Sequence, residues 1–191
     1  MTDELGPAPG LPDETFEHDG LITKRLLRAA AFAHLRPMPE QLLWDVGAGS
    51  GAVGIEWARS APGAHAVGIE RDPVRADRAR RNVERLAPGL VQIVEGDAEV
   101  LLVGLARPDA VFIGGGGAVT DIVEACMAAL SPSGRLVAHG VTLETERTLT
   151  DLHRALGGSL SRISIDSAEP LGRFWSWRPL RPVVQWAWGK A

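Results

Sequence analysis

The chain has 191 residues, 45% of them hydrophobic, with a formal net charge of -4 and an isoelectric point near 5.7. This length suits one domain whose core covers both faces of a sheet, and it is too short for two ordinary domains. The acidic balance argues against a nucleic-acid partner, and no apolar run approaches the ~20 residues that span a bilayer. We therefore expect a cytoplasmic protein that binds neither nucleic acid nor a membrane.

Cysteine and histidine offer no framework for disulfides or metals. The single cysteine, Cys126, lies among apolar residues at a helical spacing, which favours a small buried side chain over a reactive thiol. The five histidines are scattered without the spacing of a zinc site. No metal is expected.

The N-terminal region divides at about residue 12. Residues 1–12 are rich in glycine and proline and predict a flexible tail, which leaves residues 13–191 as a single domain. From Thr23 onward, apolar residues recur at helical spacing, and the hydroxyl of Thr23 can cap that helix.

Strands and helices then alternate regularly. Strands are predicted at 41–45, 64–70, 91–95, 109–113 and 135–139. Helices are predicted to begin at Gly51 and Pro73 and to cover 119–130 and 143–156. Strands that are separated by helices indicate a parallel sheet with right-handed crossovers.

The C-terminal end breaks this rhythm. Strands are predicted at 160–166 and 183–188, joined by a loop without a helix, so they must be antiparallel if they pair. An α/β fold with a Rossmann-like, doubly wound sheet and a C-terminal antiparallel hairpin resembles the class I S-adenosylmethionine-dependent methyltransferases rather than a dehydrogenase domain.

The segment Leu42–Gly51, LLWDVGAGSG, is an apolar run that stops at an acid and breaks into alternating glycines. Gly47, Gly49 and Gly51 allow a tight turn that brings backbone N–H groups close to a ligand. Gly47-x-Gly49-x-x-Ala52 also satisfies the dinucleotide-binding fingerprint. The loop therefore predicts a nucleotide-type ligand and leaves NAD as one alternative.

Further residues at strand ends favour S-adenosylmethionine over NAD. Glu70, about 20 residues after the loop, can accept hydrogen bonds from both ribose hydroxyls, and Asp97 can accept one from an adenine amino group. In isolation, Glu70 is equally well a solvated carboxylate and Asp97 a turn residue. NAD gives no role to Asp97 or Gly51, whereas S-adenosylmethionine uses all of these positions.

Six segments indicate a particular family of methyltransferases. They are GLPDETFEHDGLITKR at Gly10–Arg25, WDVGAGSG at Trp44–Gly51, EGDA at Glu95–Ala98, FIGGGG at Phe112–Gly117, VTLE at Val141–Glu144 and WRPLRPVVQW at Trp177–Trp186. With them the chain resembles, over nearly its whole length, the precorrin-6B C(15)-methyltransferase (decarboxylating) family of cobalamin biosynthesis. That family also forms the C-terminal half of the fused precorrin-6Y C(5,15)-methyltransferase.

The resemblance implies S-adenosylmethionine as the cofactor. The residues implied to bind it are Thr23, Asp45, Gly47, Ala48, Gly49, Ser50, Gly51, Glu70, Arg71, Asp97, Ala98 and Gly114. Two departures from the family pattern, an all-glycine tetrad and Ile22 before Thr23, change neither charge nor size enough to affect cofactor binding. The carbon-5 methyltransferase domain of the fused enzymes has no counterpart here, and it is an expected partner. Family members commonly form tetramers, so a homotetramer is expected.

The implied substrate, precorrin-6B, is a large macrocycle with many carboxylates, which calls for an apolar site with a basic rim. Two segments, 24–28 and 173–181, combine arginine or lysine with apolar residues. The expected substrate-binding residues are Lys24, Arg25, Gly115, Gly116, Arg173 and Arg178, with Arg28 and Arg181 in the same segments. The alternative is that the tryptophans pack a core or a subunit interface; these are Trp175, Trp177, Trp186 and Trp188.

The implied reaction needs few catalytic side chains. Methylation needs the electron-rich carbon 15 held in line with the methyl donor, and loss of the carbon-12 acetate as carbon dioxide needs a proton handled nearby. His139 and Glu144 are candidates for proton handling, although a structural role for His139 is the stronger alternative. A methyltransferase for another acceptor stays open, but the chain lacks an Asn-Pro-Pro-Tyr type motif and has no tyrosine.

Overall fold

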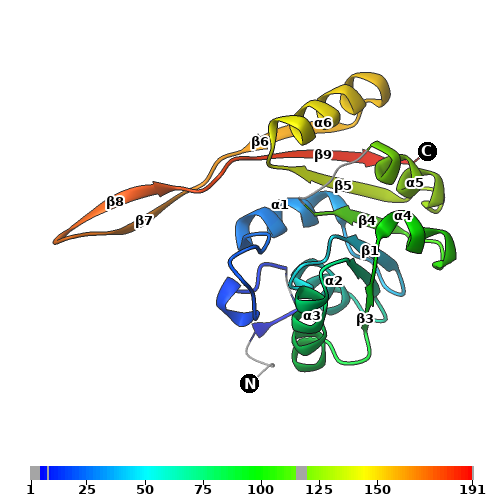
Figure 1. Cartoon of the computed structure of the whole chain (residues 1–191), viewed down its shortest axis with the longest axis horizontal. Helices are drawn as coiled ribbons and strands as arrows, with labels where there is room; N and C mark the ends of the chain where they lie inside the picture. Colours follow the sequence, from blue (N-terminus) through cyan, green and yellow to red (C-terminus); the bar gives the residue numbers. More distant parts are fainter. Residues whose placement is uncertain (1–4, 8, 115–119, 191) are drawn as a thin grey trace.

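The computed structural model describes residues 5–7, 9–114 and 120–190. A seven-stranded sheet runs through the molecule in the order β3-β2-β1-β4-β5-β9-β6 (Figure 1). Its parallel strands are β1 (Leu42–Val46), β2 (His65–Glu70), β3 (Val91–Glu95), β4 (Ala110–Ile113) and β5 (Arg135–Gly140). Strands β9 (Val183–Gly189) and β6 (Ser159–Ile163) complete it, with β9 antiparallel to both β5 and β6. The predicted α/β class and the antiparallel C-terminal pairing are confirmed.

Helices cover both faces of this sheet. One face packs against α1 (Arg25–Leu35), α2 (Ala52–Ser60) and α3 (Pro73–Leu86). The other packs against α4 (Ala98–Leu101), α5 (Thr120–Ala129) and α6 (Leu143–Leu156). Short 3-10 turns are η2 (Asp13–Thr15) and η3 (Leu102–Gly104). The central strands β1, β4 and β5 therefore lie between two apolar layers, which explains why they are nearly continuous apolar runs.

Side chains begin two of the helices. The Asp72 carboxylate accepts a hydrogen bond from the Arg75 amide, and Pro73 occupies the first turn of α3, where no N–H is needed. Thr142 and Thr145 form a reciprocal capping box at α6. These caps fix where both helices leave the edge of the sheet at which the strands end.

The segment between β6 and β9 is a hairpin, β7 (Asp166–Leu171) and β8 (Phe174–Pro179), and the prediction of a loop there was wrong. The hairpin, here called the arm, projects away from the body (Figure 1). Among the described residues its strands pair only with each other. Trp175 and Trp177 are both 71% exposed. The other pair of tryptophans packs inward, Trp186 fully and Trp188 partly.

The N-terminal segment joins the body before residue 13. Leu11 is buried, and its amide and that of Gly10 donate to the Glu56 carboxylate on α2 at 3.0 and 2.7 Å. This region was expected to be a flexible tail. Helix α1 begins at Arg25, preceded by Lys24 without a side-chain cap, so the prediction of Thr23 as the N-cap was wrong.

No helix in the ranges that the structure describes is both long enough and apolar enough to cross a membrane.

Candidate functional site

A pocket of about 750 Å³ lies at the carboxyl ends of the parallel strands. The loops after β1, β2, β3, β4 and β5 bound it, together with residues 20–24 and with Leu180, Arg181 and Val183. The strand order reverses between β1 and β4, and open α/β sheets bind ligands beside such a switch point. Its volume falls within the range usual for small-molecule sites.

The glycine loop after β1 turns back on the neighbouring strand. Gly47 and Gly49 have φ values of 76° and 57°, and the amides of Gly47 and Ala48 both donate to the Ile69 carbonyl. Gly51, at φ 75°, caps α2, and a Cβ there would lie 3.4 Å from that of Ala79. Gly51 therefore serves the turn and the packing of α3, and it is not part of the pocket wall.

Asp45 lies under this loop and is almost fully buried. Its Oδ2 accepts a hydrogen bond from the Gly54 amide at 3.0 Å. Burial raises the pKa of Asp45 to about 7, and nearby Glu70 adds to the rise, against the opposing effect of the Gly54 hydrogen bond. The floor of the pocket thus holds a carboxyl that titrates near neutral pH.

Asp45 makes folding pH-dependent in a defined direction. Because its folded-state pKa of about 7 lies above the model value of 3.8, the folded chain holds the proton more tightly than the unfolded chain. The free energy of unfolding is expected to fall as pH rises between these two values and to level off above the higher one. Urea titrations should show this slope in the parent protein and lose it in Asp45→Asn, which keeps an oxygen for Gly54. A slope that persists in the variant would assign it to another group.

Glu70 is the best-positioned carboxylate of the site. Its Oε2 accepts from the Gly49 amide at 2.8 Å and its Oε1 from the Asp72 amide at 2.9 Å. A carboxylate has about four acceptor sites, so each oxygen can still accept one more hydrogen bond. The side chain is 6% exposed and lines the pocket, which fits a pair of vicinal hydroxyls.

The predicted cofactor residues converge, with the exception of Gly51. Asp97 caps α4 through Oδ1, which accepts from the Glu99 amide at 3.2 Å, and Oδ2 is the remaining oxygen. The predicted cofactor residues that line the pocket are Thr23, Asp45, Gly47, Ala48, Gly49, Ser50, Glu70, Arg71, Asp97, Ala98 and Gly114. Their cofactor role stays a prediction.

The half of the pocket near β4, β5 and β9 is apolar. It is lined by Leu27, Phe112, Ile122, Val141, Leu180 and Val183. Two cations, Lys24 and Arg181, also line the pocket. We call the apolar region the acceptor half and the region around Glu70 the cofactor half.

His139 lies in the acceptor half and is 3% exposed. Its Nε2 lies 2.9 Å from Oε1 of Gln185, and its ring meets Phe112 edge to face with centroids 5.0 Å apart. Burial lowers the pKa of His139, and the bond to Gln185 offsets this only in part, which favours the neutral form of the ring. Glu144, the other candidate, is exposed on the first turn of α6 and does not line the pocket.

The predicted substrate residues divide between several places. Lys24 lines the pocket, whereas Arg25 is exposed beside Gly10, and Arg28 is fully buried against Glu56. Arg173 and Arg178 lie on the arm, where Arg173 stacks on Phe174 and Arg178 pairs with Glu169. Gly115 and Gly116 lie outside the described residues.

Several pocket residues were not singled out from the sequence. They are chiefly Leu21, Leu27, Arg75, Ile122, Leu180 and Val183. Apolar pocket walls carry the same pattern as core residues, so no sequence signal distinguishes them. Within the described ranges no group of three or more potential metal ligands is found, and Cys126 is buried as predicted.

Comparisons with known proteins give a consistent result. Residues 14–190 match the family model of the precorrin methyltransferase domain. A Sinorhizobium precorrin-6Y C(5,15)-methyltransferase [decarboxylating] is 50% identical over 96% of this chain and 44% of the relative. A Salmonella typhi cobalt-precorrin-6B C(15)-methyltransferase (decarboxylating) is 34% identical over 85% of each chain. The chain spans less than half the length of the first of these relatives.

Solved structures share the fold. The C-terminal domain of precorrin-6Y C5,15-methyltransferase from Rhodobacter capsulatus superposes with a TM-score of 0.89 at 42% identity, covering 97% of this chain and all of that one. A SAM-dependent O-methyltransferase from Thermotoga maritima, 18% identical with a TM-score of 0.68 over 88% of this chain and 66% of that one, shows the fold alone. The sheet is thus that of a class I methyltransferase, and the chain belongs to the precorrin methyltransferase domain family.

Proposed function

We propose that the chain uses S-adenosylmethionine to methylate carbon 15 of precorrin-6B and couples this to loss of the carbon-12 acetate as carbon dioxide. One observation carries the proposal: a site around Glu70 that suits a nucleoside adjoins an apolar half with His139, in a pocket that Lys24 and Arg181 also line. The names of the relatives described above support the same reaction.

The cofactor half has a group for each part of S-adenosylmethionine. Glu70 keeps an acceptor site on each oxygen for the ribose hydroxyls, and Asp97 keeps Oδ2 for the adenine amino group. The amides of Gly47, Ala48 and Gly49 already donate within the protein, so the start of α2 is the group we propose for the amino-acid end. When bound, this cofactor supplies an electrophilic methyl group on its sulfonium.

The acceptor half suits a macrocycle with carboxylates. Its apolar walls can cover the ring, and Lys24 and Arg181 can pair with carboxylates of the substrate. Walls of this kind also exclude water from a reacting carboxylate, which favours loss of carbon dioxide. Arg181 has no ion-pair partner among the described residues, so its guanidinium is available.

His139 is the proposed proton-handling residue. We expect His139→Ala to slow product formation with little change in the affinity for S-adenosylhomocysteine, because the ring lies at the acceptor half rather than beside Glu70. Rates of methyl transfer and carbon dioxide release measure this. A variant that carries out both steps at the parent rate would exclude the role, and the structural alternative, locking β5 to β9 through Gln185, would then stand.

The test of the function is incubation with precorrin-6B and S-adenosylmethionine, followed by mass and absorbance analysis. One added methyl with one lost carbon dioxide is expected. Parallel incubations with cobalt-free and cobalt-bearing substrate decide which form is used. Calorimetric titration with S-adenosylhomocysteine and with NAD separates the alternatives, and preferential NAD binding would overturn the proposal.

We also propose a homotetramer that works in the cytoplasm, with a carbon-5 methyltransferase domain as a fused or separate partner. The arm supports assembly, because an isolated two-stranded hairpin is marginal in water and its tryptophans are exposed. Light scattering of the purified chain measures the assembly, and a monomer at micromolar concentration would contradict the tetramer.

A further inference from the structure

Residues 17–24 pass along the cofactor half of the pocket as a strap between two fixed ends. At one end the strap meets α3, and at the other it enters α1, where the Arg28 guanidinium donates to the Thr23 carbonyl. Residues 20–24 all line the pocket. The Leu21 carbonyl oxygen would lie 3.8 Å from a Cβ placed on Gly49. The strap is therefore a wall of the pocket and faces the glycine loop.

Asn82 on α3 anchors the first end. Its Oδ1 accepts from the Glu17 amide at 2.8 Å, and its Nδ2 donates to the Glu17 carbonyl and to the Ser50 carbonyl, both at 2.9 Å. The Arg85 guanidinium donates to the same Oδ1. Asn82 is fully buried, and both of its donors and both acceptor sites are used. The side-chain amide of Asn82 thus joins the strap, at Glu17, to the glycine loop, at Ser50.

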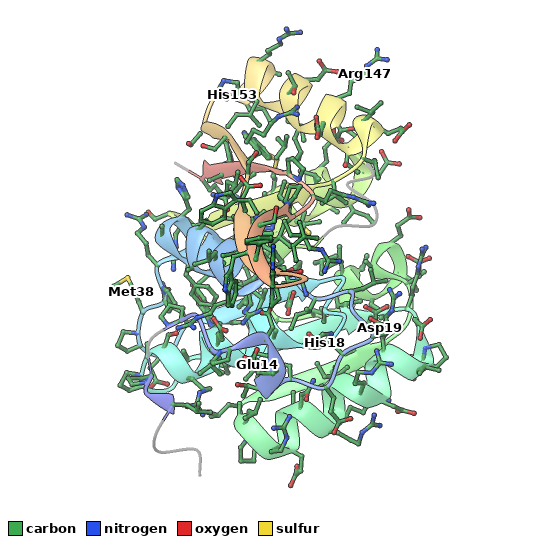
Figure 2. All side chains as sticks on the ribbon, turned by 90° about the vertical axis from the view of Figure 1, so that its left-hand side faces the viewer. Glu14, His18, Asp19, Met38, Arg147 and His153 are labelled. Atoms are coloured by element: carbon green, nitrogen blue, oxygen red, sulfur yellow. The ribbon has the colours of Figure 1, made fainter. Side chains whose placement is uncertain are left out.

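Asp19 holds the middle of the strap. Its Oδ2 lies 3.0 Å from Nε of Arg75 and 3.1 Å from Nη1 of Arg78, and its Oδ1 accepts from the Leu21 amide. Arg75 itself lines the pocket. Figure 2 shows Asp19 beside His18 on the end of the molecule from which the arm projects.

The contact of Asp19 with Arg75 and Arg78 differs from the buried contact of Asn82 because it is partly exposed. The Asp19 side chain is 31% exposed, and Gly20 has a φ of 93° with no atom within 4 Å of a Cβ placed there. Exposed ion pairs are individually weak, so they can open without unfolding the domain. Burial alone would raise the pKa of Asp19, but the Leu21 amide and the guanidinium groups of Arg78 and Arg75 lower it to about 2, so the contact stays charged at neutral pH.

We propose that Asp19 and Asn82 are positioning residues that hold the strap over the nucleoside, and that opening of the Asp19 contact to Arg75 and Arg78 sets the rate of cofactor exchange. The inference rests on the proposed function, since it concerns the same cofactor half. Asn82 keeps Glu17, at the first end of the strap, fixed beside the glycine loop while the middle of the strap moves.

The decisive variant is Asp19→Asn, compared with Asp77→Asn. Asp77 forms an exposed pair with Arg80 on the same helix at 2.5 Å and does not contact the strap. We expect Asp19→Asn to raise the dissociation rate of S-adenosylhomocysteine about tenfold. The KM for S-adenosylmethionine should rise while kcat is kept. Asp77→Asn should leave these values at the parent level.

Two further measurements do not depend on turnover. Amide hydrogen exchange at Leu21 should be faster in Asp19→Asn than in the parent without ligand. Asparagine can still accept from the Leu21 amide, but it lacks the charge that holds Arg75 and Arg78, so the strap opens more often. Asn82→Asp removes both N–H donors of the side chain and keeps its Oδ1 acceptor. In a variant whose unfolding temperature equals that of the parent, it should weaken the binding of S-adenosylhomocysteine. Equal dissociation rates in Asp19→Asn and Asp77→Asn would overturn the strap inference alone. A parent protein that binds no S-adenosylhomocysteine would overturn the proposed function.

Discussion

Glu70→Gln is expected to lower the affinity for S-adenosylhomocysteine on the order of 100-fold. Both oxygens of Glu70 accept backbone N–H groups, from Gly49 and Asp72. A glutamine has one oxygen only, so its amide nitrogen must face one of these donors. The substitution therefore removes an acceptor that we propose for the ribose, and it also disturbs the glycine loop. Calorimetric titration at neutral pH measures the loss.

Glu95→Gln is the matched control. Glu95 stands opposite Glu70 in the register of β2 and β3, but it is half exposed and pairs with Arg80 outside the pocket. Its substitution changes the same charge at the same edge of the sheet and should leave the affinity near that of the parent. Equal affinities in the two variants would exclude Glu70 as the ribose ligand.

Arg28→Met is expected to give the largest loss of stability, about 3–5 kcal/mol. Arg28 is fully buried, and its Nε lies 2.7 Å from Oε1 of Glu56, which is 1% exposed. The guanidinium also donates to Asp13 and to the carbonyls of Leu11 and Thr23. Methionine fills much of the volume but leaves the Glu56 carboxylate buried without its cation. Urea unfolding of the variant measures the change.

Two variants test this interpretation. Arg81→Gln breaks an exposed pair with Glu17 and should cost less than about 1 kcal/mol. Adding Glu56→Gln to Arg28→Met removes the stranded charge and should recover part of the loss. If Arg28→Met behaves like Arg81→Gln, the buried pair contributes little and the N-terminal segment is held by apolar packing instead.

The cofactor half could be predicted from the sequence because its signals are local. The strand of Leu42–Val46 ends in a loop whose glycines adopt positive φ, and the next strand ends at Glu70. In a parallel sheet successive strands end at the same edge. The meeting of residues far apart in the chain can therefore be predicted even when the strand register is unknown. Asp97 follows the third strand in the same way.

The acceptor half could not be predicted because it depends on tertiary pairing. Gln185 meets His139 only through the antiparallel register of β9 with β5, which no spacing encodes. The arm escaped prediction because Gly172 and two prolines interrupt its alternation, and its aromatic side chains are mostly exposed rather than part of the core. Arg28 was grouped with substrate-facing cations, yet its contacts are 28 and 15 residues away, with Glu56 and Asp13.

The place of β9 in the sheet has a consequence for synthesis. This strand, which is the last of the seven sheet strands in chain order, inserts between β5 and β6, and β6 has no other neighbour in the described sheet. The strands that border the cofactor half all precede residue 114, so they can assemble while the ribosome is still translating. The acceptor half closes only after Val183 has been synthesised, so under the proposed function a nascent chain would complete its cofactor half before its acceptor half.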